Sequence, residues 1–272
     1  MTVYEQHKGR WKLTLEYDGT PFAGWQKQAN VLSVQECLET AIHKFCGETV
    51  TTHVAGRTDA GVHALGQVAH VDLQKESDPR TVRDAINFHL RPHPVAVVKA
   101  EAASEEFHAR FSALRRIYCY KILMGRRADA VLDDKRVWHV GHELDISAMQ
   151  KAAKHLLGEH DFTTFRDSAC QAKSPLRTLD RVEFVEDKSA PGFGRRIELW
   201  VEAKSFLHHM VRNITGTLKM VGEGKWQPDD VKTALEAKDR TKGGPTAPAE
   251  GLYFVRVEYD DSAFIKGIDS LL

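Results

Sequence analysis

The chain alternates between short stretches of period-two hydrophobicity, typical of strands, and longer stretches in which apolar residues recur every three or four positions, typical of helices. Residues 11–17 alternate apolar and polar side chains and are predicted to form a strand. A capping box at residues 33–36 predicts the start of a helix, and Gly47 is placed to end it in a left-handed conformation. Two strand-like runs follow, at residues 50–55 and 66–73.

A second helix is predicted to begin after Asp78, which is suited to cap it, with Pro79 at the first helical position. Residues 95–100 then supply a further strand. The order strand–helix–strand–strand–helix–strand is that of a ferredoxin-like unit. We therefore place a first domain at residues 1–104, with a linker around residues 102–107.

The second half, residues 105–272, repeats this order loosely and without a repeat in the sequence. Its predicted elements are, in order, strands at 117–123 and 136–140, a helix from Asp145 to Gly158, a hairpin of 182–185 and 196–203 around the loop 187–194, a helix from about His208 to Met220, a shorter helix after Pro228 and a strand at 252–259. The predicted fold class is thus α+β, two ferredoxin-like (βαββαβ) halves with antiparallel sheets. A catalytic cleft between the two halves is the expected place for a site.

Composition narrows the class of protein. The 272 residues include 38 Lys and Arg and 38 Asp and Glu, so the formal net charge is +0 and the surface is not uniformly basic. A hydrophobic content of 42% argues against disorder. No stretch approaches the roughly 18 to 20 apolar residues that a membrane helix needs, and the start of the chain lacks a signal-peptide core. With four scattered cysteines that form no metal-binding pattern, the sequence indicates a cytoplasmic protein that does not enter membranes.

One segment departs from this charge balance. Residues 107–128 carry six basic side chains and no acidic one. Tyr118 and Tyr120 lie within it, two residues apart, and therefore on one face of a strand. Basic side chains interleaved with aromatic ones suit RNA, because Arg binds phosphate and an aromatic ring stacks on an exposed base. The alternative is that both tyrosines belong to the core and the arginines form a solvated rim.

The most unusual loop lies between two predicted strands, at residues 56–64 (GRTDAGVHA). Its glycines, Gly56 and Gly61, permit a tight backbone close to a partner. Asp59 has Arg57 two residues before it and small residues after it, which leaves its carboxylate accessible to a ligand. Taken alone, the pattern also fits an Asx-turn at Asp59 with a solvated Arg57.

A third motif lies in the predicted helix from about His208. At a spacing of four residues, His208 shares a helix face with Arg212, and His209 shares one with Asn213. The two histidines are expected to point apart, which excludes them as paired ligands of the H-E-x-x-H kind, and we predict no metal. Their alternative role is hydrogen bonding in a half-buried position. Arg212, on a mostly apolar segment, should seek a carboxylate where it is buried.

Taken together, these motifs resemble the tRNA pseudouridine synthase A family. The loop at residues 56–63 is similar to the signature of that family. The other similar segments follow in the expected order and are Tyr17-Asp18-Gly19-Thr20, Gly24-Trp25-Gln26, Ser33-Val34-Gln35, residues 107–113, Arg116 with Tyr118 and Tyr120, Phe162-Thr163-Thr164-Phe165-Arg166, residues 208–213 and Glu250-Gly251-Leu252-Tyr253. The resemblance covers essentially residues 11–260.

The resemblance implies an enzyme that isomerises uridine to pseudouridine at positions 38, 39 and 40, in the anticodon stem and loop of tRNA. It implies no cofactor and no metal, and a homodimer that holds the tRNA. Asp59 matches the catalytic Asp in the cleft, and Tyr118 matches the tyrosine that stacks on the target base. Arg57 matches the residue that fills the gap left by the flipped nucleotide, and Arg212 matches a buried cation that pairs with the Asp.

The basic run and the histidine motif supply three more expected substrate contacts, Arg110, Arg116 and His208. Two other classes of function remain as alternatives. A non-catalytic RNA-binding or RNA-chaperone protein would explain the basic run but gives no reason for Asp59 beside Arg57. A metal-dependent nuclease would need a cluster of carboxylates or histidines, for which no segment has suitable spacing.

Overall fold

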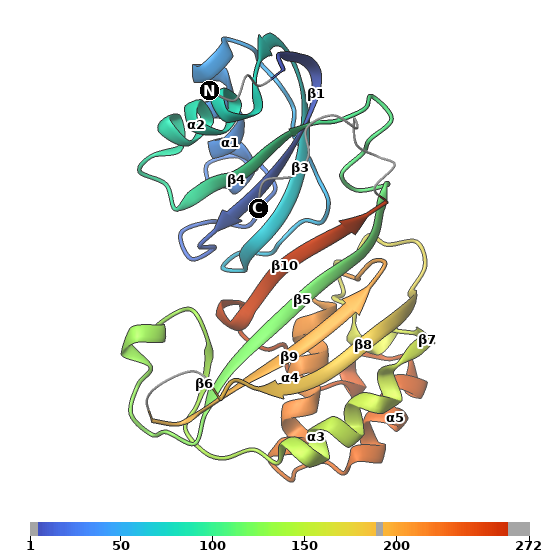
Figure 1. Ribbon diagram of the computed structural model, residues 1–272. Helices are drawn as coiled ribbons and strands as arrows, with labels where there is room; N and C mark the ends of the chain where they lie inside the picture. Colours follow the sequence, from blue (N-terminus) through green and yellow to red (C-terminus); the bar gives the residue numbers. More distant parts are fainter. Residues whose placement is uncertain (1–4, 189–192, 261–272) are drawn as a thin grey trace. The chain divides into compact units, whose positions relative to one another are not determined.

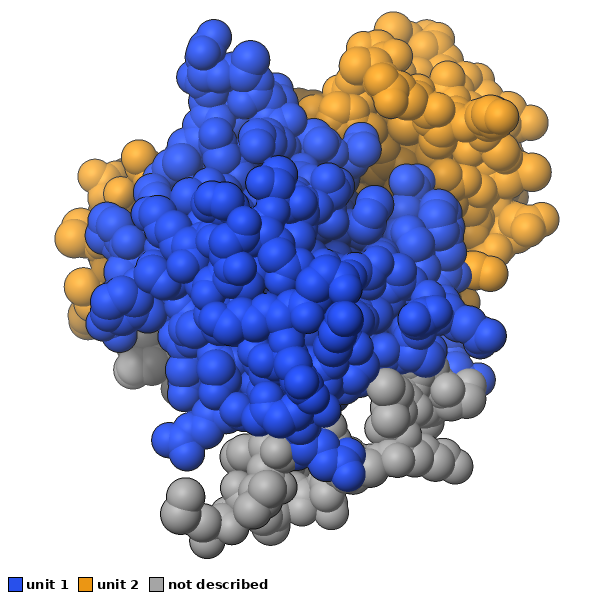
Figure 2. All heavy atoms as spheres, turned by 90° about the horizontal axis from the view of Figure 1, so that it is seen from above, with its two compact units in different colours: residues 1–114, 254–272 blue, residues 115–253 orange. Residues whose placement is uncertain are grey.

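The computed structural model describes residues 5–188 and 193–260, in which strands and helices form a mixed α+β protein (Figure 1). The chain divides into two compact units, coloured separately in Figure 2. Unit 1 comprises Met1–Leu114 and Phe254–Leu272, and unit 2 comprises Arg115–Tyr253. The predicted α+β class is confirmed. The sequence-based boundary after residue 104 differs from this division, because unit 1 extends to residue 114 and takes up the end of the chain.

Unit 1 is built on an antiparallel sheet. Strand β1 (His7–Tyr17) lies in its middle and pairs on one side with β4 (Val95–Ala102) and on the other with β3 (His63–Ser77). The short β2 (His53–Val54) pairs with the far edge of β3. The strand order β4-β1-β3-β2, with all pairs antiparallel, is the ferredoxin-like arrangement that the element order predicts.

Two helices lie against one face of this sheet, α1 (Val34–Cys46) and α2 (Pro79–Leu90) (Figure 1). Their predicted ends are confirmed. The hydroxyl of Ser33 accepts a backbone N–H in the first turn of α1, and Gly47 ends the helix at a left-handed φ of +77°. The carboxylate of Asp78 caps α2 in the same way, by accepting two backbone N–H groups.

The core of unit 1 follows from the alternation along β1. Trp11, Leu13 and Leu15 are each 0% exposed. The apolar stripes of the two helices, which include Ile42 and Ile86, are buried to the same degree. Truncating one of these large side chains to Ala leaves a cavity and costs about 3 kcal/mol. Burial of this one face therefore fixes the register of β1, since a shift by one residue would expose all three side chains.

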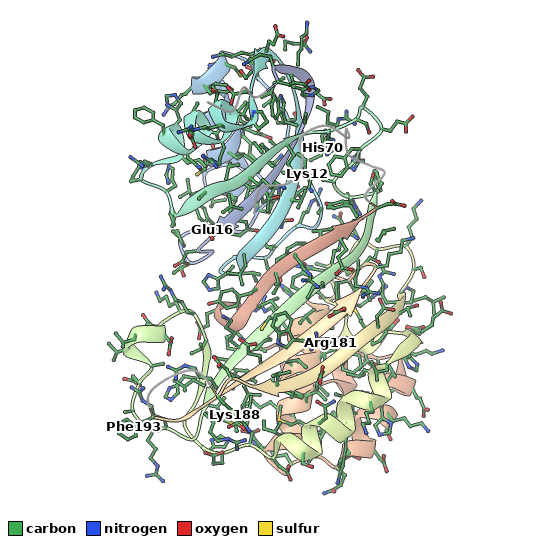
Figure 3. The ribbon with its side chains drawn as sticks, viewed as in Figure 1. Lys12, Glu16, His70, Arg181, Lys188 and Phe193 are labelled. Carbon is green, nitrogen blue, oxygen red and sulfur yellow. The ribbon has the colours of Figure 1, made fainter. Side chains whose placement is uncertain are left out.

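The opposite face of the sheet carries polar groups that are also covered. Lys12 and His70 stand directly opposite each other on β1 and β3 (Figure 3). The ammonium of Lys12 lies 3.2 Å from a carboxylate oxygen of Glu101. The ring of His70, only 2% exposed, stacks on His53 at a centroid distance of 4.9 Å and meets His108 edge-on at 4.6 Å.

The expected linker at residues 102–107 lies within unit 1. Arg10 on β1 donates to the backbone carbonyls of Glu105 and Phe107, the latter at 2.8 Å. The same guanidinium forms a bidentate pair with Asp72, at 2.7 and 2.8 Å, which lowers the pKa of that carboxyl. This segment is therefore tied to the sheet by one arginine.

Unit 2 also contains a sheet. Strand β5 (Ala113–Met124) pairs antiparallel with β9 (Arg195–Ala203), and β9 pairs with β8 (Leu176–Glu186). Strand β7 (Gly158–Asp161) extends the sheet beyond β8, while β6 (Trp138–Val140) runs parallel to β5. The predicted hairpin of β8 and β9 is confirmed. Pro191 and Gly192, in the predicted loop of the β8–β9 hairpin, lie outside the described residues.

Three helices of unit 2 pack on one another, α3 (Ile146–Ala153), α4 (Met210–Gly222) and α5 (Pro228–Ala237) (Figure 1). Asp145 caps α3 as predicted. The predicted end at Gly158 is wrong, because the chain passes through a 3₁₀ turn after α3 and residue 158 already begins β7. Strand β10 (Leu252–Tyr259) has the predicted bounds; its first two residues belong to unit 2 and the rest to unit 1.

Across residues 5–188 and 193–260, no helix combines the length and the apolar character needed to cross a bilayer.

The buried His70 predicts how stability depends on pH. Burial above all, and then the nearby His108, Arg10 and His53, lower the pKa of His70 from 6.5 to about 4. Between these two pH values the unfolded chain binds the proton and the folded chain does not. We therefore expect the free energy of unfolding to fall as the pH drops from 6.5 to 4, by at most about 3 kcal/mol from this group.

This expectation can be checked by urea unfolding of wild type and His70→Gln between pH 7.5 and 4. The substitution keeps a hydrogen-bond acceptor but cannot titrate, so the dependence of stability on pH should become shallower. His43→Gln, at an exposed histidine of α1, should keep the wild-type dependence. Parallel curves for wild type and His70→Gln would contradict the assignment.

Candidate active site

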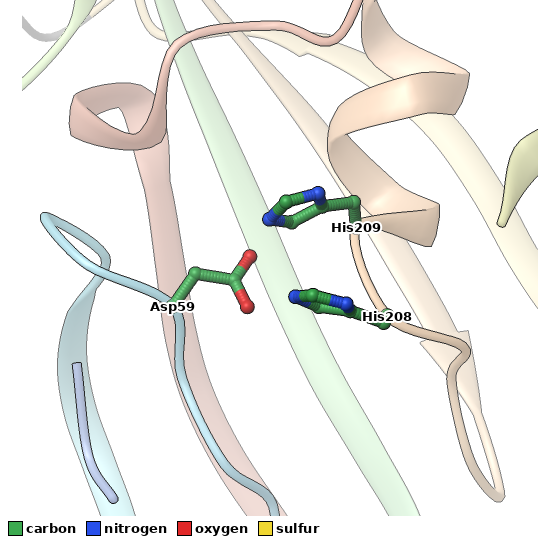
Figure 4. Close-up of side chains that lie close together, drawn as sticks. All are labelled: Asp59, His208 and His209. Atoms are coloured by element: carbon green, nitrogen blue, oxygen red, sulfur yellow. The ribbon is translucent and has the colours of Figure 1, made fainter. Parts of the chain in front are cut away.

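The loop between β2 and β3, residues 55–62, carries Asp59 (Figure 4). It is a compact turn, in which the N–H of Val62 donates to the carbonyl of Asp59 at 3.2 Å. The loop is also bonded to the segment that precedes α1, because the N–H of Trp25 donates to the carbonyl of Thr58 at 3.0 Å. The backbone on both sides of Asp59 is therefore fixed.

Two glycines permit the close approach that these bonds require. A Cβ at Gly24 would lie 2.6 Å from the carbonyl oxygen of Thr58, and this glycine has a left-handed φ of +98°. A Cβ at Gly19 would lie 2.1 Å from the carbonyl oxygen of Val62. Both distances are shorter than any van der Waals contact, so only glycine fits at either position. This explains why the motifs around residues 19 and 24 accompany the Asp59 loop in the sequence.

Buried polar groups hold the loop from beneath. The hydroxyl of Tyr17 lies 2.8 Å from the hydroxyl of Thr58, and the side-chain amide of Gln67 donates both to Tyr17, at 3.3 Å, and to the carbonyl of Gly56, at 2.8 Å. Burial raises the pKa of Tyr17 to about 12, so its hydroxyl stays protonated. With Thr58 turned inward, its neighbour Asp59 is half-buried.

The two polar residues of the loop that could act on a ligand remain accessible. Arg57 is exposed, and Asp59, two residues later, is partly exposed. The loop closes at His63, the first residue of β3, whose Nδ1 accepts the N–H of Gly19 at 3.1 Å. The arrangement presents a carboxylate on a rigid backbone, which is what a nucleophile or a base requires.

In unit 2, Tyr118 lies on β5 opposite Val201. It is 8% exposed, and its ring meets that of Phe206 edge-on at 5.0 Å. Tyr120, on the same face of the strand, is fully buried and donates its hydroxyl to the carbonyl of Pro248 at 2.7 Å. Burial also raises the pKa of Tyr120. Both tyrosines are therefore buried, Tyr120 completely and Tyr118 with a small part of its surface exposed.

The basic residues of this region have different environments. Arg116 on β5 is 7% exposed and donates to the backbone carbonyl of Lys204. Arg110 belongs to unit 1 and is exposed, with its guanidinium carbon 5.6 Å from the centre of the Phe111 ring. The basic run of the sequence is thus shared between the two units.

The structure corrects the expected geometry of His208 and His209. Both precede α4, which begins at Met210, and His209 has a left-handed φ of +59°. The prediction that the two side chains share helix faces with residues 212 and 213 is therefore wrong. So is the prediction that they point apart, since the centres of their rings lie 4.0 Å apart at an interplanar angle of 36° (Figure 4).

Asp167 orients this histidine pair and was missed by the sequence reasoning. One of its carboxylate oxygens lies 2.7 Å from Nδ1 of His209, and the other lies 3.8 Å from Nδ1 of His208. Hydrogen bonding from the N–H of Ala169, and then from His209, lowers the pKa of Asp167. The only signal in the sequence is its position directly after the motif that ends at Arg166.

Arg212 lies in the first turns of α4. Its Nε donates to the carbonyl of Ala247 at 2.8 Å, and the N–H of Ala247 donates to the carbonyl of Arg212 at 3.1 Å. A Cβ at Gly216 would lie 1.7 Å from the carbonyl oxygen of Pro245, so the chain around residues 245–247 is held close against the helix. The pairing of Arg212 with Asp59 of unit 1 stays a prediction.

Comparison with solved structures finds the archaeal box H/ACA sRNP Nop10–Cbf5 complex, with a TM-score of 0.37 and 12% sequence identity over 94% of this chain. The match covers 50% of the other chain, so this protein spans about half its length.

Comparison of the amino-acid sequence with those of known proteins identifies the family. The profile of the family described as tRNA pseudouridine synthase matches residues 14–112 and 152–260. A tRNA pseudouridine synthase A of Paramagnetospirillum magneticum is 58% identical over 95% of this chain and 98% of its own. Those of Rhodospirillum centenum and Methylocella silvestris are 57% and 54% identical, over 92% and 93% of this chain and 99% of each relative. The chain therefore belongs to the tRNA pseudouridine synthase A family, the enzymes that isomerise uridine in tRNA.

Proposed function

We propose that this tRNA pseudouridine synthase acts on positions 38, 39 and 40 of the anticodon stem and loop, with Asp59 as its catalytic group. We further propose that it works as a homodimer in the cytoplasm. The observation that supports the catalytic assignment most directly is the half-buried carboxylate of Asp59 on a loop that two glycines and a buried hydroxyl pair hold in place. The substrate positions rest on the resemblance of the motifs to those of the family.

The chemistry accounts for a carboxylate at this place. The isomerisation breaks the bond between C1′ of the ribose and N1 of uracil, turns the base and joins C1′ to C5. The hydrogen that C5 carried leaves as a proton, and N1 gains a proton. A carboxylate beside the ribose can attack the sugar or base, or remove a ribose proton, and it stabilises positive charge at C1′. No step requires an oxidant, a reductant or a second substrate.

The target base must leave the helical stack before this bond can be reached, at a cost of a few kcal/mol. Stacking on Tyr118 would return about 1 to 3 kcal/mol. Arg57, exposed on the same loop as Asp59, would fill the space that the nucleotide leaves. In this proposal Arg212 orients the catalytic carboxylate, whereas Arg110, Arg116 and His208 contact the tRNA.

Asp59→Asn tests the catalytic assignment. The amide keeps the size of the side chain but removes the charge, so release of tritium from tRNA labelled at C5 of uridine should fall by about 10³-fold or more. Affinity for tRNA should persist, because the substitution leaves the loop in place. Asp84→Asn, at an exposed carboxylate of α2, is the matched control and should retain full activity. Full activity of Asp59→Asn would end the proposal, and strand cleavage by the wild type would indicate a nuclease.

Tyr118→Phe separates stacking from proton transfer. The ring and its contact with Phe206 remain, so KM for tRNA should not change, while loss of the hydroxyl should lower kcat by about 10²-fold if it helps to remove the proton from C5. Tyr120→Phe is the matched control: it loses the bond to Pro248 and about 1 kcal/mol of stability, but should keep kcat. An unchanged kcat in Tyr118→Phe would show that the hydroxyl has no part in the reaction.

Gly24→Ala tests whether the packed backbone, rather than Asp59 alone, sets the activity. The added methyl would collide with the carbonyl of Thr58, so the loop must move and kcat should fall by at least 10-fold, on the order expected for a misplacement of about 1 Å. Gly47→Ala introduces the same methyl at a similar left-handed φ of +77°, but into open space, and should cost only stability. Equal kcat values in the two variants would contradict this account.

A further inference from the structure

We propose that Phe111 in unit 1 is a stacking platform for a nucleobase of the tRNA other than the target uridine. This inference rests on tRNA being the substrate and adds a second place at which the chain contacts it. The side chain of Phe111 is 75% exposed. Single exposed apolar side chains are common on protein surfaces, so the inference depends on the surroundings of this ring.

The ring of Phe111 is the outermost of a chain of aromatic rings. It lies 4.3 Å from the ring of His108, at an interplanar angle of 35°. His108 in turn lies 4.6 Å from the buried His70, which stacks on His53 at 4.9 Å. The exposed ring therefore packs on His108, whose ring in turn contacts those of His70 and His53 on the sheet. A planar base could stack on the side of the Phe111 ring that faces away from His108.

The backbone beneath the platform is held in one conformation. Nδ1 of His108 accepts the N–H groups of both Arg110 and Phe111, at 3.1 and 3.3 Å. The hydroxyl of Ser112 accepts the N–H of His108 at 3.0 Å, and the N–H of Ser112 donates back to the carbonyl of His108 at 2.9 Å. Four hydrogen bonds thus close the turn that presents the ring. Binding therefore requires little further ordering of this backbone, which lowers its entropic cost.

A second set of bonds joins this turn to the sheet. Nδ1 of the buried His70 accepts the N–H of Ala109 at 3.1 Å. The hydroxyl of Tyr259 at the end of β10 donates to the carbonyl of Ala109 at 2.7 Å. The ring of Tyr259 also packs edge-on against Phe107 at 5.1 Å. Rigid elements therefore carry the platform, even though it lies in a connecting segment.

The charge around the ring favours a nucleic acid over an apolar partner. The guanidinium carbon of Arg110 lies 5.6 Å from the centre of the Phe111 ring, so a cation adjoins the exposed ring. An aromatic ring flanked by a cation can take a base on its face and the adjoining phosphate on the cation. Bases inside a duplex offer no face for stacking, so the occupant is an unpaired or terminal base of the tRNA.

Phe111→Ala tests the platform in the full-length protein. Loss of one stacked base should raise Kd for tRNA, measured by fluorescence anisotropy, and KM by about 10-fold, while kcat stays unchanged. Phe111→Tyr keeps the aromatic face and should bind as wild type does. Phe88→Ala is the matched control, because Phe88 on α2 is 68% exposed and, within residues 5–188 and 193–260, its ring meets only that of its neighbour His89. Unchanged affinity in Phe111→Ala, or equal losses in the Ala and Tyr variants, would overturn the proposal.

Salt and mass measurements identify the occupant. Stacking releases no counterions, so Phe111→Ala should shift the plot of log Kd against log salt without changing its slope. A changed slope would mean that the residue only orients phosphate contacts. Sedimentation should give the same mass for wild type and Phe111→Ala; a smaller mass for the variant would place a second copy of the chain on this ring and overturn the proposal.

His108 acts as a positioning residue for the platform, and its variants provide a further test. His108→Ala should lose as much affinity as Phe111→Ala, and the double variant no more than either. His108→Asn supplies an oxygen that can accept the same backbone N–H groups and should restore binding. All affinities can be measured in the Asp59→Asn background. If the catalytic proposal fails, Asp59→Asn itself will release tritium. If the platform proposal fails, adding Phe111→Ala will leave the affinity for tRNA unchanged. Additive losses in the double variant would contradict the positioning role.

Discussion

Close contact between backbone atoms is the constraint on which the rest of the site in unit 1 depends. At Gly19 and Gly24 the chain approaches the Asp59 loop so closely that a single methyl group has no room. The bonds from Trp25 and from the buried Tyr17 act only because this approach is possible. The position of the Asp59 carboxylate therefore depends on packing between backbone atoms of other segments.

Unit 2 uses the same principle for its own polar residues. A glycine of α4, Gly216, allows the chain near Pro245 to lie against the helix, and this segment receives the guanidinium of Arg212. The histidine pair before α4 is held by the carboxylate of Asp167 from another loop. In both units, side chains on irregular segments gain fixed positions from backbone packing and buried hydrogen bonds, which is how loops can carry precise chemistry.

Local patterns in the sequence were enough to predict most of the elements, because caps and hydrophobic periodicity act over a few residues. Ser33 and Asp78 cap the first turns of α1 and α2, and Gly47 ends α1, all as predicted. Nothing local indicated that His209 would adopt a left-handed backbone, which moved the start of α4 to Met210 and brought the two histidine rings together. Asp167 was missed for a related reason, since it acts on a residue 42 positions away. The motif resemblance located the Asp59 loop, but only the packing explains its glycines.

The division of the chain has a consequence for its synthesis. Unit 2 is an insertion within unit 1, because unit 1 resumes at Phe254 after the whole of unit 2. Tyr259, which closes on Phe107 and Ala109, leaves the ribosome after every described residue of unit 2. Unit 2 can therefore complete its contacts first, whereas unit 1, which bears Asp59, is completed only after residues 254–260 have been synthesised. A nascent or truncated chain that stops at Tyr253 would have unit 2 in full and the Asp59 loop in an unfinished unit.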